Sequence, residues 1–188
     1  KQAFYNCSTL TSITIPDGVT KIEDDAFFGC SNLKSITIPN AVTEIGYGAF
    51  SGCSNLKSIT IPNSVTKIGD NAFSGCSNLA EFKGKFSSID SRCIIIDGIL
   101  KGFARYGLTE YTIPDGVKEI EFGAFSGCSN LKSITIPDSV TKIGLGAFTN
   151  CSGLTSITIP NGVTEIEPTV FANCSGLTNI IIPNNVTS

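Results

Sequence analysis

Large apolar residues recur along this chain at fixed offsets, and polar residues fill the positions between them. The clearest stretch runs from Cys128 to Asn150 as CSNLKSITIPDSVTKIGLGAFTN. Near copies of it start at Cys30, Cys53 and Cys151, at a period of 23. Side chains of a strand alternate between its two faces, so Ile134 and Ile136 point the same way. The pattern predicts one short strand in each repeat.

The rest of the repeat predicts a turn and a return to the core. Pro137 ends the strand, because proline lacks the N–H that a continuing ladder needs and Pro-Asp-Ser favours a turn. Val140 and Ile143 then point inward again. Ala147 and Phe148 close the coil in a short irregular or single-turn helical piece.

Stacking of the repeats follows from their energetics. The inward residues of one coil contribute roughly 1.5–3 kcal/mol each, while ordering costs about 1–2 kcal/mol for every residue fixed. One coil is therefore unstable alone, and neighbouring coils must cover its two apolar faces. One leucine position recurs in every coil: Leu10, Leu33, Leu56, Leu79, Leu108, Leu131, Leu154 and Leu177. One phenylalanine position recurs in seven: Phe4, Phe27, Phe50, Phe73, Phe125, Phe148 and Phe171.

The pattern C-x-x-L-x-x-I-x-I-P-x-x-V-x-x-I-x-x-x-A-F resembles the BspA-like, treponeme-type leucine-rich repeats over almost the whole chain. We therefore expect a leucine-rich-repeat-like, right-handed solenoid. Its parallel β-sheet would lie on the concave face, with short strands and turns or single-turn helical pieces elsewhere. The resemblance implies a secreted or cell-surface protein of host-associated microbes, of a kind often described as an adhesin.

A single array is expected over residues 1–188, with repeats starting at positions 7, 30, 53, 76, 105, 128, 151 and 174. The repeat over residues 76–104 is irregular, because it is longer than the others and lacks the I-P and A-F pairs. Its Asp97-Gly98 pair between two apolar runs predicts a hairpin over residues 93–101 with a type I′ turn. The chain begins and ends inside a repeat, as expected of a segment from a longer array.

Seven of the eight cysteines hold one position of the repeat: Cys7, Cys30, Cys53, Cys76, Cys128, Cys151 and Cys174. Parallel side chains at the strand spacing of about 4.8 Å hold the Cβ atoms too far apart for disulfides. We interpret the row as buried thiols that act as small apolar residues; pairwise bridges such as Cys7–Cys30 are the alternative. With no histidine and no C-x-x-C, a metal site is not expected.

A charged position after the turn alternates in sign from one repeat to the next. It carries Lys21, Glu44, Lys67, and later Glu119, Lys142, Glu165. The alternation predicts a ladder of ion pairs between neighbouring coils. Such pairs contribute little stability when exposed, so their expected role is register.

Candidate partner-binding residues gather in and beside the irregular repeat. Five of the 13 basic residues, including both arginines, lie between positions 83 and 105. Arginine and tyrosine are enriched at interfaces, which singles out Arg92, Lys101, Arg105 and Tyr106. Lys34, Lys57 and Lys132 project from the Ser/Thr-rich sheet and are weaker candidates. The alternative is that the hairpin pads a widened coil, with Phe82, Phe86 and Phe103 replacing lost aliphatic core.

Other classes of function find little support. Triads that use an imidazole base are excluded by the absence of histidine, phosphate-binding glycine loops are absent, and we expect no enzyme and no cofactor. The net charge of −3 argues against nucleic acid, and no apolar run is long enough to span a bilayer. Two functions remain: binding of a protein or glycan ligand, such as host extracellular matrix, or a spacer that presents another domain. End-to-end self-association through uncapped coils is a further expectation.

Overall fold

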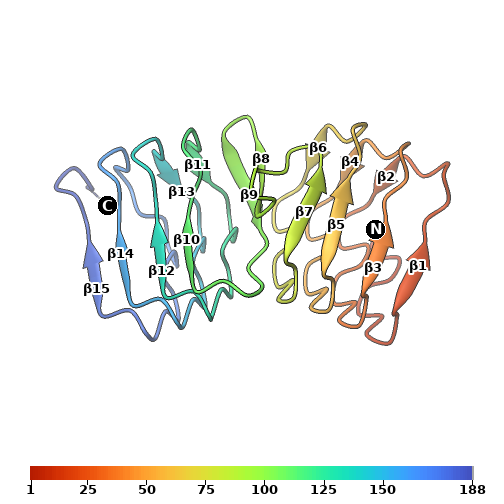
Figure 1. Cartoon of the computed structure of the whole chain (residues 1–188), viewed down its shortest axis with the longest axis horizontal. Coiled ribbons are helices and arrows are strands. Elements are labelled where there is room, and N and C mark those ends of the chain that lie inside the picture. The colour runs from red at the N-terminus through yellow and green to blue at the C-terminus, as the bar shows by residue number, and fades with distance from the viewer. Residues whose placement is uncertain (188) are drawn as a thin grey trace. The chain divides into compact units, whose positions relative to one another are not determined.

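The computed structural model describes residues 1–187, which form fifteen strands and no helix (Figure 1). Each regular repeat supplies one longer strand after its Cys-x-x-Leu segment and most supply a two-residue strand after the proline turn. The longer strands are β1 (Ser12–Thr14), β3 (Ser35–Thr37), β5 (Ser58–Ile61), β7 (Glu81–Gly84), β10 (Glu110–Thr112), β12 (Ser133–Thr135), β14 (Ser156–Thr158) and β15 (Asn179–Ile181). The two-residue strands are β2 (Lys21–Ile22), β4 (Glu44–Ile45), β6 (Lys67–Ile68), β11 (Glu119–Ile120) and β13 (Lys142–Ile143).

The chain divides into two compact units. The first contains Lys1–Ile94 and Gly102–Tyr106, and the second contains Ile95–Lys101 and the residues from Gly107 onward. In the first unit β1 pairs with β3, β5 pairs with β7, and the short strands follow the order β2-β4-β6. In the second unit the longer strands follow the order β10-β12-β14-β15, and β11 lies between β13 and β9.

Strand pairing is parallel between equivalent positions of consecutive repeats. Ser12 pairs with Ser35 and Lys21 pairs with Glu44, and in each case the two partners are one full repeat apart. This register confirms the predicted solenoid of parallel strands. The Ala-Phe segments are turns rather than single-turn helices, so of the two predicted alternatives the non-helical one is present in the described residues.

The core of each unit is built from ladders of identical residues. Within residues 1–187 every buried side chain is apolar or a cysteine, and Leu56, Phe50 and Val65 are fully buried. The phenylalanine rings stack in parallel, with centroids 5.3–5.9 Å apart along Phe4–Phe27–Phe50–Phe73 and 5.1–5.7 Å apart along Phe125–Phe148–Phe171. Stacking of equivalent rings gives each inner coil an apolar neighbour on both sides.

The irregular repeat keeps the core closed by different means. Phe82 is fully buried and meets Phe73 edge-on, with ring centroids 5.1 Å apart, and Phe103 is also buried. Both rings therefore replace aliphatic core, as predicted, whereas Phe86 is only half-buried and its ring centroid lies 4.8 Å from the Lys85 ammonium. Gly84 has φ of 81°, and a Cβ there would lie 2.2 Å from the carbonyl oxygen of Ile61, which explains why the second strand isoleucine is absent.

A hairpin follows in the irregular repeat. Strands β8 (Cys93–Ile96) and β9 (Ile99–Phe103) are neighbours in one sheet and are joined by two residues. Asp97 has φ of 52° and Gly98 has φ of 82°. Positive φ at both turn positions is what a type I′ turn requires.

Candidate binding surfaces

The loop that precedes β8 in the first unit is fixed by its own hydrogen bonds. The Ser88 N–H donates to the carbonyl oxygen of Cys93 (2.8 Å), and the Ser91 N–H donates to that of Ser88 (2.8 Å). The Ser88 hydroxyl accepts from the Cys93 N–H (2.8 Å) and donates to the Asp90 carboxylate, which also accepts from the Arg92 N–H (3.0 Å). Local side-chain bonds of this kind hold a loop in one conformation without regular secondary structure.

This loop presents an isoleucine to solvent. The exposed fraction of Ile89 is 108%, the highest among the large apolar side chains of the described residues, and Tyr106 of the same unit is 55% exposed. The Arg92 guanidinium donates from Nη1 to the carbonyl oxygens of Ala104 (3.2 Å) and Tyr106 (3.1 Å). Arg92 therefore ties the loop to the segment that carries Tyr106. We call Ile89, Arg92 and Tyr106 the loop surface.

Ile89 was not among the residues that the sequence singled out. Attention to charged and aromatic residues favoured its neighbours, whereas an isolated isoleucine in an apolar-rich chain looks like core. The available signal was its setting: Ser87-Ser88-Ile89-Asp90-Ser91 is rich in turn-forming residues. An apolar residue within such a turn has no strand to turn it inward.

Two other candidates, one in the irregular repeat and one at the start of the next, are partly enclosed. The Lys101 ammonium pairs with the Glu121 carboxylate in the second unit, and the two side chains are only 14% and 12% exposed. Arg105 is half-buried, and its positive charge partly offsets the raised pKa of the Cys76 thiol in the first unit. Both residues remain predicted binding residues, but Lys101 has a structural partner that limits its availability.

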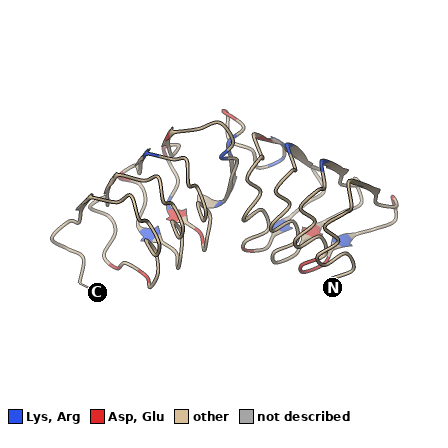
Figure 2. Cartoon of the chain, turned by 90° about the horizontal axis from the view of Figure 1, so that it is seen from below, with Lys and Arg blue, Asp and Glu red and all other residues tan. Residues whose placement is uncertain are grey.

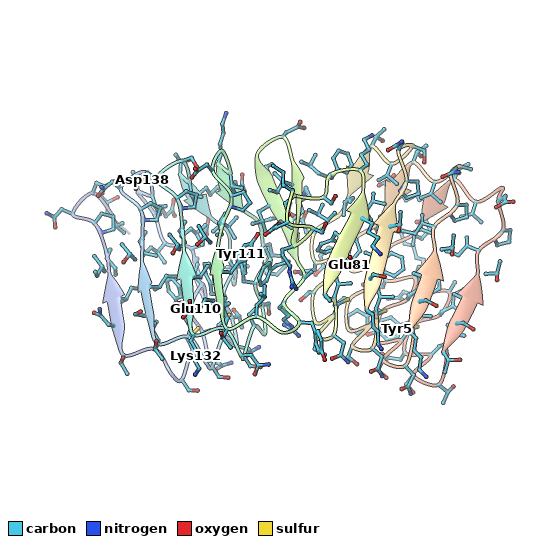
Figure 3. The ribbon with its side chains drawn as sticks, viewed as in Figure 1. Tyr5, Glu81, Glu110, Tyr111, Lys132 and Asp138 are labelled. Atoms are coloured by element: carbon cyan, nitrogen blue, oxygen red, sulfur yellow. The ribbon has the colours of Figure 1, made fainter. Side chains whose placement is uncertain are left out.

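The lysines on the longer strands lie in open positions. Lys34 and Lys57 are exposed in consecutive coils of the first unit. Lys132 is exposed in the second unit, where it precedes β12, and Figure 3 shows it with Glu110 at the lower ends of β12 and β10. The structure thus brings Lys34 and Lys57 into one row and places Lys132 in the other unit.

The predicted ladder of alternating charge is confirmed on the short strands (Figure 2), whereas Glu165, its last predicted member, lies outside them. In the first unit Glu44 lies 3.1 Å from both the Lys21 and the Lys67 ammonium groups. In the second unit the carboxylate of Glu119 lies 2.8 Å from the Lys142 ammonium. The hydrogen bonds from the lysines, that from Lys21 first, lower the pKa of Glu44, so this carboxylate stays ionised between its two lysine partners.

The cysteines are free thiols, as predicted, and all but Cys7 are buried. Their sulfurs also have a partner that the sequence did not reveal. The Cys53 thiol donates to the carbonyl oxygen of Phe27 (3.2 Å), and the Cys151 thiol donates to that of Phe125 (3.2 Å). Burial raises the pKa of Cys53, and raises that of Cys76 to about 12. These thiols are therefore protonated at neutral pH, which makes them poor nucleophiles.

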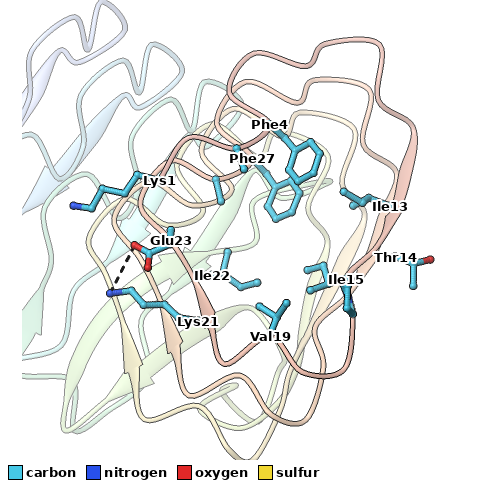
Figure 4. A pocket seen from close by; sticks show the side chains of 13 residues that line it. Lys1, Phe4, Ile13, Thr14, Ile15, Val19, Lys21, Ile22, Glu23 and Phe27 are labelled. Carbon is cyan, nitrogen blue, oxygen red and sulfur yellow. Dashed lines mark ion pairs between the residues drawn. The ribbon is translucent and has the colours of Figure 1, made fainter.

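An apolar cavity of about 260 Å³ lies beside the first coil of the first unit (Figure 4). Its walls are members of the core ladders, including Phe4, Ile13, Ile15 and Val19. At its rim the Lys21 ammonium lies 4.0 Å from the Glu23 carboxylate. In later coils the equivalent ladder residues pack against a neighbouring coil. The walls of this cavity are therefore apolar in the same way as the interface between two coils.

Within residues 1–187 no cluster of three or more histidine, cysteine, aspartate or glutamate side chains is arranged to hold a metal ion. No helix of suitable length and apolarity to cross a membrane occurs in that part of the chain.

Comparison with protein families places the repeats. Residues 1–95 and 100–188 match the model of the BspA type leucine rich repeat region, in six copies. No curated protein matches the sequence significantly.

Solved structures of similar chains are bacterial. A leucine rich cell surface protein from Faecalibacterium prausnitzii shares 35% sequence identity, with a TM-score of 0.83 over 99% of this chain. The match covers 57% of that protein, so this chain spans less than two thirds of its length. A leucine-rich repeat protein from Eubacterium ventriosum shares 25% identity, with a TM-score of 0.63 over 97% of this chain and 69% of that one. The pneumococcal vaccine antigen PcpA shares the fold, with 20% sequence identity and a TM-score of 0.63. That match covers 95% of this chain and 59% of PcpA.

Proposed function

The chain belongs to the BspA-type leucine-rich repeat family, and we propose that it is a non-catalytic, protein-binding module exposed outside the cell or at its surface. Its ligand in this proposal is a protein of a host extracellular matrix. Leucine-rich repeat families are typically non-catalytic, and the similar protein of Faecalibacterium prausnitzii is described as a cell surface protein.

The loop surface is the observation that carries this proposal. The inner regular coils bury the two isoleucines of their longer strands, such as Ile134 and Ile136, whereas Ile89 is held outward by a loop with fixed geometry. An apolar side chain that is already ordered loses little conformational entropy on binding. Tyr106 adds an exposed aromatic ring, and tyrosine and arginine are enriched among the residues that dominate binding energy.

The proposed partner is therefore a protein with an apolar pocket that accepts Ile89. Arg92 has a positioning role in this arrangement, because its guanidinium already bonds two backbone carbonyls. Arg105 would lie toward the rim, where charges affect association rate more than affinity.

The test is binding of this chain to immobilised fibronectin, laminin and collagen by surface plasmon resonance. The test variant is the double change Ile89→Ser and Tyr106→Ser, which alters only exposed side chains. The control is Leu145→Ser with Tyr47→Ser, because these residues are 42% and 48% exposed but lie elsewhere. Surface substitutions of this kind change stability by about 0.5 kcal/mol or less.

We expect saturable binding to at least one matrix protein, weakened at least about tenfold by the loop-surface variant and less than about twofold by the control. Equal weakening in both variants would contradict a site at the loop surface. An absence of saturable binding to all three proteins would favour the alternative function, a spacer that presents another domain.

A second proposal concerns self-association between copies of this chain. The cavity beside the first coil is lined by apolar ladder residues, and Ile181 on β15 is an exposed isoleucine. Sedimentation velocity between about 5 and 500 μM would show a concentration-dependent increase in mass. The change Ile13→Lys, within the cavity wall, would abolish that increase if the contact forms there.

A further inference from the structure

A second recess, in the second unit, differs in chemistry from the apolar cavity. It has a volume of about 340 Å³ and lies beside the start of β12. Its walls are Gly107, Leu108, Thr109, Ser129, Asn130, Lys132 and Gly153. The volume falls at the lower end of the range of small-ligand sites. The lining contains one cation, one amide, two hydroxyl groups and no acidic residue.

Asn130 is the third residue of its repeat, and the third residues of successive repeats form a row along the coils. The recess exists because glycine occupies this position in the repeats before and after Asn130. In the first unit the equivalent row carries asparagine in three consecutive coils. There the Asn55 amide donates to Asn32 Oδ1 (3.2 Å) and the Asn78 amide donates to Asn55 Oδ1 (3.2 Å). In the second unit the positions on either side of Asn130 hold Gly107 and Gly153. The side chains that would fill the row are therefore missing on both sides.

Glycine at position 153 also has a local structural reason. A Cβ on Gly153 would lie 2.2 Å from the carbonyl oxygen of Ser129, so no larger residue fits without movement of the backbone. Gly107 has no such constraint from packing, because nothing lies within 4 Å of its Cβ position. The close approach of the coils explains glycine at position 153, whereas Gly107 is favoured by its φ of 78° rather than by packing.

The polar groups of the recess retain their capacity to bind a ligand. Within the described residues, the Asn130 amide makes no side-chain hydrogen bond and the Lys132 ammonium has no ion-pair partner. In the first unit, by contrast, the hydroxyls of Ser54 and Ser77 donate to the carbonyl oxygens of Ser31 (3.2 Å) and Ser54 (3.3 Å). The same row is thus satisfied internally in one unit and left open in the other.

We propose that this recess binds a carboxylate-bearing sugar residue, such as a hexuronic acid or a sialic acid. In this arrangement Lys132 pairs with the ligand carboxylate, while Asn130, Thr109 and Ser129 hydrogen-bond its hydroxyl groups. An acidic ligand fits because Lys132 is the only charged residue in the lining. A sugar fits better than a peptide carboxyl end, because Leu108 alone offers an apolar wall for a side chain. Glu110, adjacent to Thr109, lies outside the lining.

Binding of monosaccharides to this chain can be followed by chemical-shift perturbation in solution NMR. The probes are glucuronic acid and N-acetylneuraminic acid, with glucose as the neutral control and acetate as the bare carboxylate. Test variants are Lys132→Gln, which removes the charge, and Gly107→Asn, which places an asparagine side chain in the recess. Asparagine tolerates the φ of 78° at this position better than other non-glycine residues. The matched control is Lys57→Gln, at the same position of a first-unit repeat.

We expect saturable shifts with an acidic sugar at about 50 mM salt, centred on residues 107–109 and 129–132. Affinity should fall at least about tenfold in both test variants and at least about fivefold at about 0.5 M salt, and should be unchanged in Lys57→Gln. Glucose should bind at least about tenfold more weakly. Equal affinity for acetate, an equal loss in Lys57→Gln, retained affinity in Lys132→Gln, or no saturable shift with either acid would each overturn the proposal.

This site is independent of the loop surface, because its residues belong to the second unit and the loop surface belongs to the first. Loss of protein binding in the Ile89 and Tyr106 variant would leave sugar binding intact. Failure of either proposal can therefore be recognised without affecting the other.

Discussion

The two units share a core and differ at their exposed rows. Each stacks leucine, isoleucine, phenylalanine and cysteine at the same repeat positions. In the first unit, however, exposed polar groups bond to one another: Glu44 lies between two lysines, and Asn55 lies between two asparagines. In the second unit, Glu119 has one lysine partner and Asn130 stands between two glycines.

This difference shows where a repeat protein can acquire an individual function. A core side chain packs between equivalent residues of the preceding and following coils, so a change at one coil must suit two neighbours. An exposed side chain has water on one side and tolerates replacement. Core positions therefore keep the same residues from coil to coil, whereas surface positions change in side-chain size, hydrogen bonding or charge.

The largest expected effects test whether the two cores are equivalent. Phe50 and Phe148 are both fully buried, and each ring stacks between two others. Phe50→Ala and Phe148→Ala should each lower the free energy of unfolding by about 3–5 kcal/mol, measured by urea denaturation. A loss below about 1 kcal/mol in either variant, or losses that differ by more than about 2 kcal/mol, would show that the cores are not equivalent.

The regular coils could be predicted from sequence because one pattern fixes them many times over. The inward positions of Ile134 and Ile136, the stop at Pro137 and the pairing of Lys21 with Glu44 all follow from one constant repeat period. Each coil constrains its neighbours, so an error in one repeat would conflict with the others. The alternating ladder was predictable for the same reason, since register alone brings opposite charges together.

The individual features were harder to predict, because each occurs once. The outward position of Ile89 depends on hydrogen bonds of Ser88 and Asp90, which no repeat pattern encodes. The enclosure of Lys101 depends on Glu121 in the next coil. The sequence located the irregular repeat, but residue type alone could not distinguish a cation that faces solvent from one that is paired inside.

A smaller effect should separate the two forms of the asparagine row. Gly153→Ala forces a Cβ against the Ser129 carbonyl oxygen and should cost about 1–3 kcal/mol of unfolding free energy. Asn55→Ala removes two side-chain amide hydrogen bonds, one exposed and one partly buried, and should cost less than about 1 kcal/mol. Urea denaturation of both variants measures the contrast. A larger loss in Asn55→Ala would mean that the ladder, rather than the close approach of the coils, dominates this row.

The smallest effect concerns the charge ladders. Glu44→Gln removes two ion pairs and Glu119→Gln removes one. Glu44→Gln should therefore lower the thermal midpoint of unfolding more than Glu119→Gln does. Because salt screens exposed charges, about 1 M NaCl should reduce both decreases. The hydrogen bonds from Lys21 and Lys67 lower the pKa of Glu44 in the folded state. Its contribution is therefore present above the unfolded pKa of about 4.3 and is lost as pH falls through the lower folded value.

The difference in thermal midpoint between the native chain and Glu44→Gln should accordingly be constant from about pH 5.5 to 7 and should shrink below about pH 4. A difference that persists unchanged at about pH 3 would assign the effect of Glu44 to packing of its side chain against the short strands. In that event the ladder would contribute no electrostatic stability in the first unit, and the contrast between two lysine partners and one would have no energetic consequence.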